Sequence, residues 1–445
     1  MFRHGDVTRR GFLRGTAAAA SAVACPALVP ASALGRDQQA APSQRVVTGV
    51  VGLGFGWQMF TGGPDVQCVA VCDVRQDRRD AAQQALGGPG RCAAYGDFRE
   101  LVAREDIDAV YIATPDHWHA LVTIAAAKAG KDVYCQKPLT RTIAEGRAVV
   151  QAVKRYGIVF QHGTQQRQDP KMLFGCELVR NGYIGELRRV KIGSPRAQGG
   201  GPTQPQPVPP GLDWDMWLGP APWAPFCPQR IQAHDWYFIS DYCLGYIAGW
   251  GVHHADSAQQ GAGLDEVTGV IEVDARGEFA PGLFDNPFAW DMHYRFPDGV
   301  TWHWTDTTDG WDGRLPGPDT RQWNGKKYPM GILFEGTEGW VYIWRGLVDA
   351  EPKSLLEVKI SQRDKVHLVS PGGRPIPGFI ECVKNRLASC APVEVAHRAT
   401  NLCSIGAISM LLGRTVNWDT VREEFVGDEE ANRLRFRAMR PPWRI

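Results

Sequence analysis

This sequence lacks most features that mark membrane, nucleic-acid-binding or metal-binding proteins. After residue 40 no run approaches the roughly 20 consecutive apolar residues needed to cross a bilayer. The formal net charge is only +1, and the first forty residues alone contribute +3, so no basic stripe remains for nucleic acid or an anionic membrane. The eleven cysteines form no CxxC pair, and no HExxH or similar cluster predicts a metal site. With 445 residues, the chain is long enough for two globular domains.

Signatures of two common hydrolase mechanisms are also missing. No GxSxG sequence is present, so nucleophilic Ser-His-Asp catalysis is not indicated. The pair of catalytic carboxylates that most glycosidases use cannot be identified either. Any cleavage of a glycosidic bond would therefore need another chemical route.

The first forty residues are typical of a targeting segment. The stretch TRRGFLRG, Thr8 to Gly15, is followed by the weakly apolar run TAAAASAVACPALV and by the small residues ASA, which permit cleavage after Ala33. This order resembles a twin-arginine export signal, although a chance Arg-Arg pair is the alternative. We therefore expect residues 1–40 to be signal and linker, the twin-arginine translocase to be a transient partner, and the folded protein to be periplasmic or otherwise extracytoplasmic.

Strand and helix patterns alternate between Val46 and about Gln165. Five β-branched or apolar runs are separated by helical patterns such as RRDAAQQAL and HALVTIAAAKAG, which predicts a parallel sheet with right-handed crossovers. The runs are RVVTGVVGLGFG, VQCVAVCD, DAVYIATP, DVYCQKP and GIVFQHGTQ. We expect an α/β dinucleotide-binding domain over residues 45–165.

The composition changes in the second half of the chain. Residues 199–228 hold nine prolines and five glycines, which predicts a long irregular loop. Strand-like runs follow (VTGVIEVDARGEF, FAWDMHYRF, VTWHWTDTT, GWVYIW), with helical patterns IPGFIECVKNRLAS and ATNLCSIGAISMLL behind them. We expect a second α/β domain over residues 166–445, built on a large, mostly antiparallel sheet.

A glycine-rich turn follows the first predicted strand. Glycines there let the backbone turn tightly and approach a pyrophosphate, whose charge free N–H groups at a helix N-terminus would meet. The fingerprint is imperfect, because the third glycine stands one place early. The residues expected to contact the dinucleotide are Gly52, Leu53, Gly54, Phe55, Gly56 and Trp57.

The second predicted strand ends at an acidic residue. Asp73 stands twenty-one residues after Gly52, where a carboxylate accepts hydrogen bonds from both ribose hydroxyls and repels a 2′-phosphate. We therefore expect NAD rather than NADP, although Arg75 could soften that preference. A simple strand-end cap is the alternative role for Asp73.

The stretch DVYCQKPLT ends a buried strand by presenting a lysine. Lys137 falls at the carboxyl edge of the parallel sheet, where ligands of open α/β sheets bind, and Pro138 fixes the turn behind it. Desolvation beside a positively charged nicotinamide would lower the lysine pKa toward neutrality, and the amine could then relay the proton of a carbinol. The alternative is an ordinary surface lysine in a loop.

The segment from ATPDHWH to GTQQRQDP, residues 113–170, resembles the Gfo/Idh/MocA oxidoreductase family, whose mark is Glu-Lys-Pro at this strand end. Similarity continues through DWDMWLGPAPWAPF, DYCLGYIAGWGVHHADSAQQ and EEFVGDEEANRLRF. The resemblance implies an N-terminal Rossmann domain, a C-terminal α/β domain with an open sheet, and a homo-oligomer. It also implies that Thr114, Pro115, His119, Gln136 and Lys137 lie against the cofactor, and that Lys137 and His253 are catalytic.

A carbohydrate or polyol is the substrate class that the resemblance implies. Arg167 stands where the family often contacts substrate or cofactor, and aromatic faces can stack on the C–H face of a sugar ring. The residues expected to bind substrate are Arg167, Trp236, Tyr242, His253 and His254. The alternative for the two histidines is core packing at a helix start, and for the aromatic residues it is packing within the second domain.

Two positions depart from the family pattern. Gln136 replaces the glutamate before the lysine, which removes a nearby negative charge and would lower the lysine pKa. Gly249 stands where the family often has an aspartate that assists the catalytic histidine. Nothing in the sequence identifies a replacement, and Asp241 and His254 are candidates only.

These observations predict an exported oxidoreductase that transfers hydride from a sugar or polyol to a tightly bound NAD. The cofactor would have to stay bound because little free NAD exists outside the cytoplasm. One alternative is redox-neutral glycoside cleavage through transient oxidation, elimination, water addition and reduction. A binding protein of the same fold that has lost turnover is the other, given Gln136 and Gly249.

Overall fold

The computed structural model describes residues 44–54, 56–232, 234–306, 321–323, 326–328, 330–368 and 375–445. The expected signal at residues 1–40 and the turn residue Phe55 lie outside these described residues. Within the described part of the chain, no helix combines the length and the hydrophobicity that crossing a bilayer requires.

The first half of the chain contains a six-stranded parallel sheet in the order β3-β2-β1-β4-β5-β6. The order reverses between β1 and β4, and this reversal opens a crevice at the carboxyl ends of the strands. The predicted α/β fold is confirmed, although the short strand β3 was not predicted. The strands are β1 (Val46–Val51), β2 (Val66–Cys72), β3 (Ala93–Tyr95), β4 (Ala109–Ile112), β5 (Asp132–Cys135) and β6 (Phe160–His162).

Helices connect these strands, and local capping explains where they begin and end. Helix α5 starts with a capping box, in which Thr142 and Glu145 satisfy each other's backbone N–H, and it ends at Gly157 in the left-handed conformation. Helix α4 starts at Asp116, directly after Pro115, and so earlier than the predicted HALVTIAAAKAG pattern. The helices of this region are α2 (Gln76–Ala85), α3 (Phe98–Val102), α4 (Asp116–Lys128) and α5 (Ile143–Tyr156).

A nine-stranded sheet carries the second half of the chain, in the order β15-β14-β13-β7-β10-β9-β8-β16-β17. It is mostly antiparallel, as predicted, but β7 and β10 pair in parallel. In a separate two-stranded sheet, β11 (Arg321–Trp323) pairs antiparallel with β12 (Lys326–Tyr328). The strands of the large sheet are β7 (Leu187–Gly193), β8 (Val270–Glu278), β9 (Ala289–Arg295), β10 (Thr301–Thr305), β13 (Gly331–Gly336), β14 (Trp340–Trp344), β15 (Leu347–Glu351), β16 (Val416–Asp419) and β17 (Glu424–Phe425).

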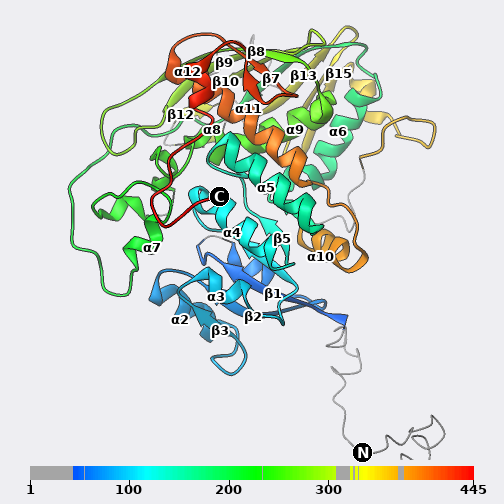
Figure 1. The fold of residues 1–445 in the computed structure, drawn as a ribbon. Coiled ribbons are helices and arrows are strands. Elements are labelled where there is room, and N and C mark those ends of the chain that lie inside the picture. Colours follow the sequence, from blue (N-terminus) through cyan, green and yellow to red (C-terminus); the bar gives the residue numbers. More distant parts are fainter. Residues whose placement is uncertain are drawn as a thin grey trace, which may run out of the picture. The chain divides into compact units, whose positions relative to one another are not determined.

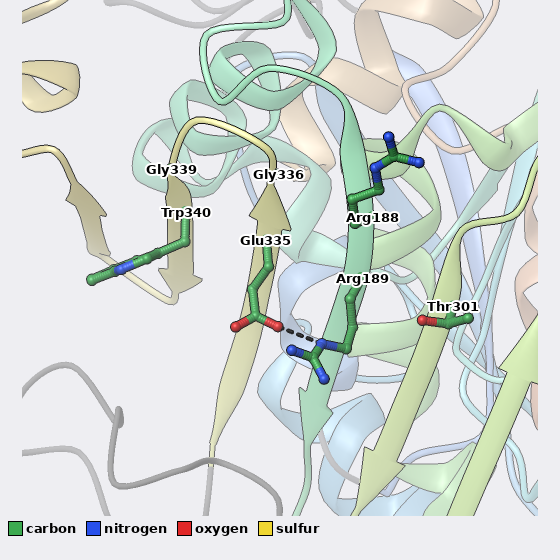
Figure 2. A pocket seen from close by; sticks show the side chains of 7 residues that line it. All are labelled: Arg188, Arg189, Thr301, Glu335, Gly336, Gly339 and Trp340. Atoms are coloured by element: carbon green, nitrogen blue, oxygen red, sulfur yellow. Dashed lines mark hydrogen bonds and ion pairs between the residues drawn. The ribbon is translucent and has the colours of Figure 1, made fainter.

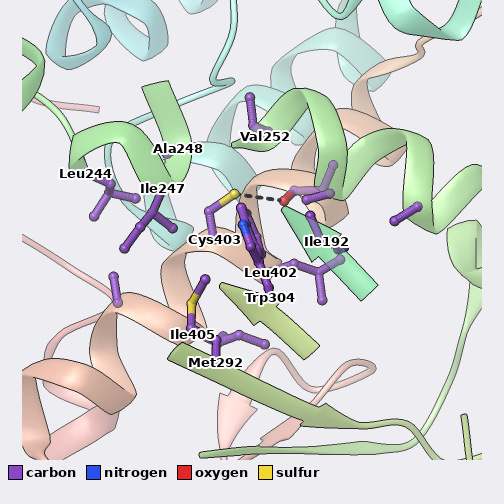
Figure 3. Close-up of a cluster of buried hydrophobic side chains, with 14 of the residues drawn as sticks. Ile192, Leu244, Ile247, Ala248, Val252, Met292, Trp304, Leu402, Cys403 and Ile405 are labelled. Carbon is purple, nitrogen blue, oxygen red and sulfur yellow. Dashed lines mark hydrogen bonds between the residues drawn. The ribbon is translucent and has the colours of Figure 1, made fainter. Parts of the chain in front are cut away.

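Long helices cover one face of this sheet. Helices α6 (Pro170–Arg180), α9 (Val252–Ala262) and α11 (Val393–Leu412) pack against its strands (Figure 1). In Figure 3, Trp304 and Met292 from the strands lie among Cys403, Ile405 and other side chains of the helices. Burying these apolar surfaces contributes roughly 25 cal/mol per Å² to stability, so this layer is the main core of the second half.

Strand β9 shows how the sheet acquires two different faces. Its Trp290, Met292 and Tyr294 are buried against the helices, whereas Asp291 and His293 point the other way and are exposed.

The expected loop at 199–228 is irregular apart from short helices. The remaining helices are α7 (Trp214–Leu218), α8 (Gly245–Gly249), α10 (Pro375–Asn385) and α12 (Glu429–Arg433), with 3₁₀ turns η3 (Trp57–Phe60), η4 (Gln165–Gln168), η5 (Pro228–Arg230), η6 (Asp235–Phe238), η7 (Leu264–Glu266) and η8 (Lys353–Glu357). The boundary expected between residues 165 and 166 stays a prediction.

Candidate active site

A cavity of about 770 Å³ lies at the carboxyl ends of the parallel strands. It is bordered by the glycine turn after β1, the end of β2, the start of α4, the turn after β5, and parts of η6 and α9. Its size is within the range of small-molecule sites. The predicted site residues that line it are Gly52, Leu53, Gly54, Asp73, Thr114, Pro115, Gln136, Lys137, Trp236 and His253.

A second hollow, of about 510 Å³, lies on the nine-stranded sheet (Figure 2). Its charged side chains already have partners. Arg189 donates to Glu335 at 2.6 Å, and Arg188 donates to Glu186 at 2.6 Å. None of the predicted site residues lines this hollow, so the larger cavity is the candidate active site.

At Gly52 the glycine turn lies so close to the backbone of Ala113 that no larger residue would fit. Gly52 has a φ of +91°, and a Cβ placed on it would lie 2.5 Å from the carbonyl carbon of Ala113. The Leu53 N–H donates to Asp73 Oδ2 at 2.8 Å, and the Arg75 N–H donates to Asp73 Oδ1 at 2.9 Å. Asp73 therefore braces the turn and also borders the cavity, and its contact with a ribose stays a prediction.

Two arginines near Asp73 have different roles in the structure. The Arg75 guanidinium donates to Asp77 at 3.0 Å and does not line the cavity. Arg78 does line it, with Nη1 at 3.7 Å from Asp73 Oδ2. The cation beside the predicted ribose position is thus Arg78, which the sequence interpretation missed because only the α2 helix geometry separates the two.

Lys137 is held at the inner end of the cavity. Its Nζ donates to the Gly249 carbonyl oxygen at 2.5 Å and to the Tyr237 hydroxyl at 3.2 Å. Burial lowers the pKa of Lys137, and the nearby Asp116 carboxyl opposes that shift. The side chain is therefore not the surface lysine of the alternative interpretation.

Tyr237 explains the glycine at position 249. A Cβ on Gly249 would lie 2.4 Å from Tyr237 Cδ1, so the aromatic ring fills the space that a larger residue would need. The hydroxyl of the same ring contacts Lys137. Neither Asp241 nor His254 lines the cavity. Tyr237 therefore fills the space beside Gly249 and contacts Lys137, and burial raises its pKa well above the usual range.

Asp116, at the first turn of α4, is the carboxyl group that acts on Lys137, and it was not predicted. It is buried, lines the cavity and interacts electrostatically with Lys137 and Cys243. Burial raises the pKa of the Asp116 carboxyl to about 7, while Cys243 and Lys137 act in the opposite direction. The sequence signal was weak, because an aspartate at a helix start usually serves only the helix.

The contacts of Gln136 show how its neutral amide is accommodated where the family has a glutamate. Its Nε2 donates to the Tyr111 hydroxyl at 2.6 Å, and its Oε1 would lie 2.8 Å from a Cβ on Gly163. The amide thus fits a neutral and tightly packed position. The negative charge beside Lys137 comes from Asp116 instead.

His253 borders the cavity from the first turn of α9. Among the described residues its Nδ1 has no hydrogen-bond partner, and burial lowers its pKa well below the usual value, with Lys137 adding to the shift. The ring is therefore neutral and can accept or donate one hydrogen bond to a ligand. Trp250 and Arg345, which the sequence interpretation did not select, also line this side, and the Arg345 guanidinium lies 5.6 Å from the Trp250 ring centre.

The other predicted residues lie outside the cavity lining. Arg167 is buried in ion pairs with Asp256 at 2.8 Å and with Asp265 at 2.7 Å. Its position braces η4 against α9 and η7 rather than reaching the cavity. Further residues outside the lining are His119, in contact with the Pro138 and Thr114 carbonyls, Tyr242, packed on Trp217, His254, in contact with the Gly193 carbonyl, and Gly56 and Trp57 at the start of η3.

Comparison with known protein families shows to which family the chain belongs. The model of the oxidoreductase family with an NAD-binding Rossmann fold matches residues 46–164, and the model of that family's C-terminal alpha/beta domain matches residues 197–305 and 337–445. The chain belongs to the Gfo/Idh/MocA family. The resemblance seen in the sequence is confirmed, and the family's NAD-binding region coincides with the glycine turn and cavity described above.

Curated relatives match over less than half of the chain. Myo-inositol 2-dehydrogenase of Thermotoga maritima is 31% identical over 170 residues, which are 37% of this chain and 47% of the relative. Levoglucosan dehydrogenase of Pseudarthrobacter phenanthrenivorans is 41% identical over 91 residues, 20% of this chain and 23% of the relative. The chain spans at most about half the length of these relatives.

Solved structures share the fold over most of the chain. The aldose-aldose oxidoreductase from Caulobacter crescentus, complexed with glycerol, has a TM-score of 0.58 at 17% identity, covering 84% of this chain and 99% of that one. An NAD-binding protein from Listeria innocua has a TM-score of 0.56 at 21% identity, covering 84% and 96%. At these identities the similarity establishes the fold alone.

The packing of Tyr237 on Gly249 generates a first prediction. Gly249→Asp should destabilise the protein by about 1–3 kcal/mol, as overpacked sites do, because the new Cβ overlaps the Tyr237 ring. Urea unfolding of the full chain measures this loss. Gly62→Asp is the matched control, since no atom lies within 4 Å of a Cβ there. Adding Tyr237→Ala to Gly249→Asp should recover part of the stability, and an additive double variant would contradict the packing argument.

The charge of Asp116 generates a second prediction. The carboxylate raises the Lys137 pKa, so Asp116→Asn should lower it further. Lys137 would then become reactive toward an amine-modifying reagent at lower pH, which mass spectrometry of the labelled peptide measures. Asp241→Asn, outside the cavity lining, should leave the labelling profile unchanged. An unshifted profile in Asp116→Asn would refute the coupling.

Proposed function

We propose that this chain oxidises a carbinol of a sugar or polyol and that a dinucleotide bound across the glycine turn receives the hydride. The observation that carries the proposal is that the glycine turn, Asp73 and the buried Lys137 line the same cavity. Relatives that are inositol and levoglucosan dehydrogenases agree with this substrate class. Because the chain matches only part of those relatives, the activity rests on the site.

The dinucleotide fits the residues that are present. The Gly52 position admits no side chain, the Asp73 carboxylate borders the cavity, and Gly54 leaves the turn open on the cavity side. Those residues would hold the pyrophosphate and the ribose. When bound, the nicotinamide supplies the hydride acceptor.

Lys137 handles the proton in this proposal. Its lowered pKa favours the neutral amine, which can accept the carbinol proton as the C–H bond breaks. The Tyr237 hydroxyl and the Gly249 carbonyl orient the amine. Asp116 lies close enough to stabilise the ammonium that forms. The neutral His253 ring is placed to bond a substrate hydroxyl, and Trp236 offers an apolar face for the sugar ring.

We propose NAD as the preferred dinucleotide, since the Asp73 carboxylate repels a 2′-phosphate. Arg78 at the cavity wall is a cation that would reduce this preference. Tight retention of the cofactor follows from the proposed export, because an exported enzyme must regenerate its nicotinamide without exchange.

We also propose that the protein is exported to the periplasm through the twin-arginine route and works as a homo-oligomer. The paired Arg9 and Arg10 before Phe-Leu support export, and family membership supports oligomerisation. Arg9→Lys with Arg10→Lys should trap the precursor in the cytoplasm, which cell fractionation measures. A double variant that still reached the periplasm would disprove the route. A sedimentation coefficient of a monomer would disprove self-association.

The absorbance of the purified full chain tests the reaction itself. With a panel of sugars and polyols, we expect the near-ultraviolet band of reduced nicotinamide to appear with at least one compound. Lys137→Ala should slow this by about 10²–10⁴-fold, the usual contribution of a general base, while Lys128→Ala on the exposed end of α4 should not. Release of aglycone from aryl glycosides without net reduction would establish the redox-neutral cleavage instead. A protein that binds no dinucleotide would refute both proposed activities, the dehydrogenase and the glycosidase. The inactive binding protein would then be the remaining alternative.

A further inference from the structure

Two histidines and an aspartate meet on the face of the nine-stranded sheet that the long helices leave open. His293 of β9 stands directly opposite His303 of β10, and Asp291 lies two residues before His293 on the same face. The alternating Trp290, Met292 and Trp302 point into the core. This cluster is separate from the cavity, whose lining contains none of its members.

The side chains converge on one point. The two imidazole rings are nearly parallel, 6° apart, with centres separated by 4.5 Å. Both Nε2 atoms face the same oxygen, since Asp291 Oδ1 lies 2.6 Å from His303 and 3.5 Å from His293. One donor atom from each residue lies within 4.8 Å of the other two. Three ligands around one metal ion need separations of about 3.3 Å, given bonds of roughly 2.0–2.1 Å.

We propose that Asp291, His293 and His303 bind a divalent transition metal ion of the zinc, nickel or copper class. Two imidazoles and one carboxylate suit these ions and not calcium or magnesium, which prefer oxygen ligands. Three protein ligands leave one position for water. Binding would need only small side-chain shifts, because the strands already pair the ligands in register.

Exposure and charge around the cluster are compatible with an ion arriving from solvent. The side chains of His293 and Asp291 are 57% and 54% exposed, and that of His303 is 18% exposed. Asp274 stands opposite His293 on β8 and adds a second carboxylate, while Arg276, which pairs with it at 3.0 Å, partly offsets its charge. The metal would clip β9 to β10 and so stabilise the folded sheet.

The sequence hid this site, because its ligands are not a local motif. Asp291 and His293 form only an Asp-x-His pair, and His303 follows ten residues later across a strand connection. The absence of a metal site was therefore the sequence-based prediction. Strand pairing is what brings the third ligand within reach.

Calorimetric titration of the untagged full chain with zinc chloride tests the proposal. We expect one equivalent to bind per chain and the melting temperature to rise. His293→Ala and His303→Ala should each weaken binding at least about tenfold, that is by 1.4 kcal/mol or more. His367→Ala removes an exposed histidine elsewhere and should change nothing.

Copper supplies an independent reading of the ligands. The electron paramagnetic resonance spectrum of one equivalent of Cu²⁺ should show two nitrogen ligands in the wild type and one in either histidine variant. Circular dichroism of each variant establishes that it is folded. Absence of stoichiometric zinc binding, or binding that both histidine variants retain, would overturn the proposal.

Discussion

A lysine amine placed inside the protein is the constraint on which the candidate site depends. Lys137 leaves β5 at the carboxyl edge of the sheet and meets two acceptors, the Gly249 carbonyl and the Tyr237 hydroxyl. A buried ammonium is costly unless it is paired, and Asp116 provides the compensating charge. The turn after β5, the start of α4, η6 and α8 must therefore all converge on one amine. That convergence also forms the inner wall of the cavity.

The two departures from the family pattern become one rearrangement in space. Gln136 carries no charge and packs against Gly163, so the anion beside the lysine is supplied from α4. Gly249 has no side chain because the Tyr237 ring fills its place. The Asp116 carboxyl, the Lys137 amine, the Cys243 thiol and the Tyr237 phenol thus lie together in a buried region. A change in the charge of one of these groups there alters the pKa of the others.

The two faces of the nine-stranded sheet differ in composition and in proposed role. Its helix-covered face buries tryptophans and aliphatic side chains, and the ion pairs of Arg167 with Asp256 and Asp265 lie among the same helices. Arg167 was expected to bind substrate, yet its guanidinium is bound on both sides by carboxylates. The opposite face carries polar side chains at alternate positions, including the three that we assign to a metal ion.

Sequence alone determined the alternating βα units, the glycine turn, the placement of Asp73 and Lys137 at strand ends, and the antiparallel character of the second sheet. These follow from local periodicity and from short-range backbone requirements, which a linear pattern records. Only the tertiary structure decided that the Tyr237 ring fills the space beside Gly249, that Asp116 is the charge partner of Lys137, and that Arg78 rather than Arg75 borders the cavity. The contact of Tyr237 with Lys137 joins residues 100 positions apart. The pKa values depend on burial, which is a property of the packed chain.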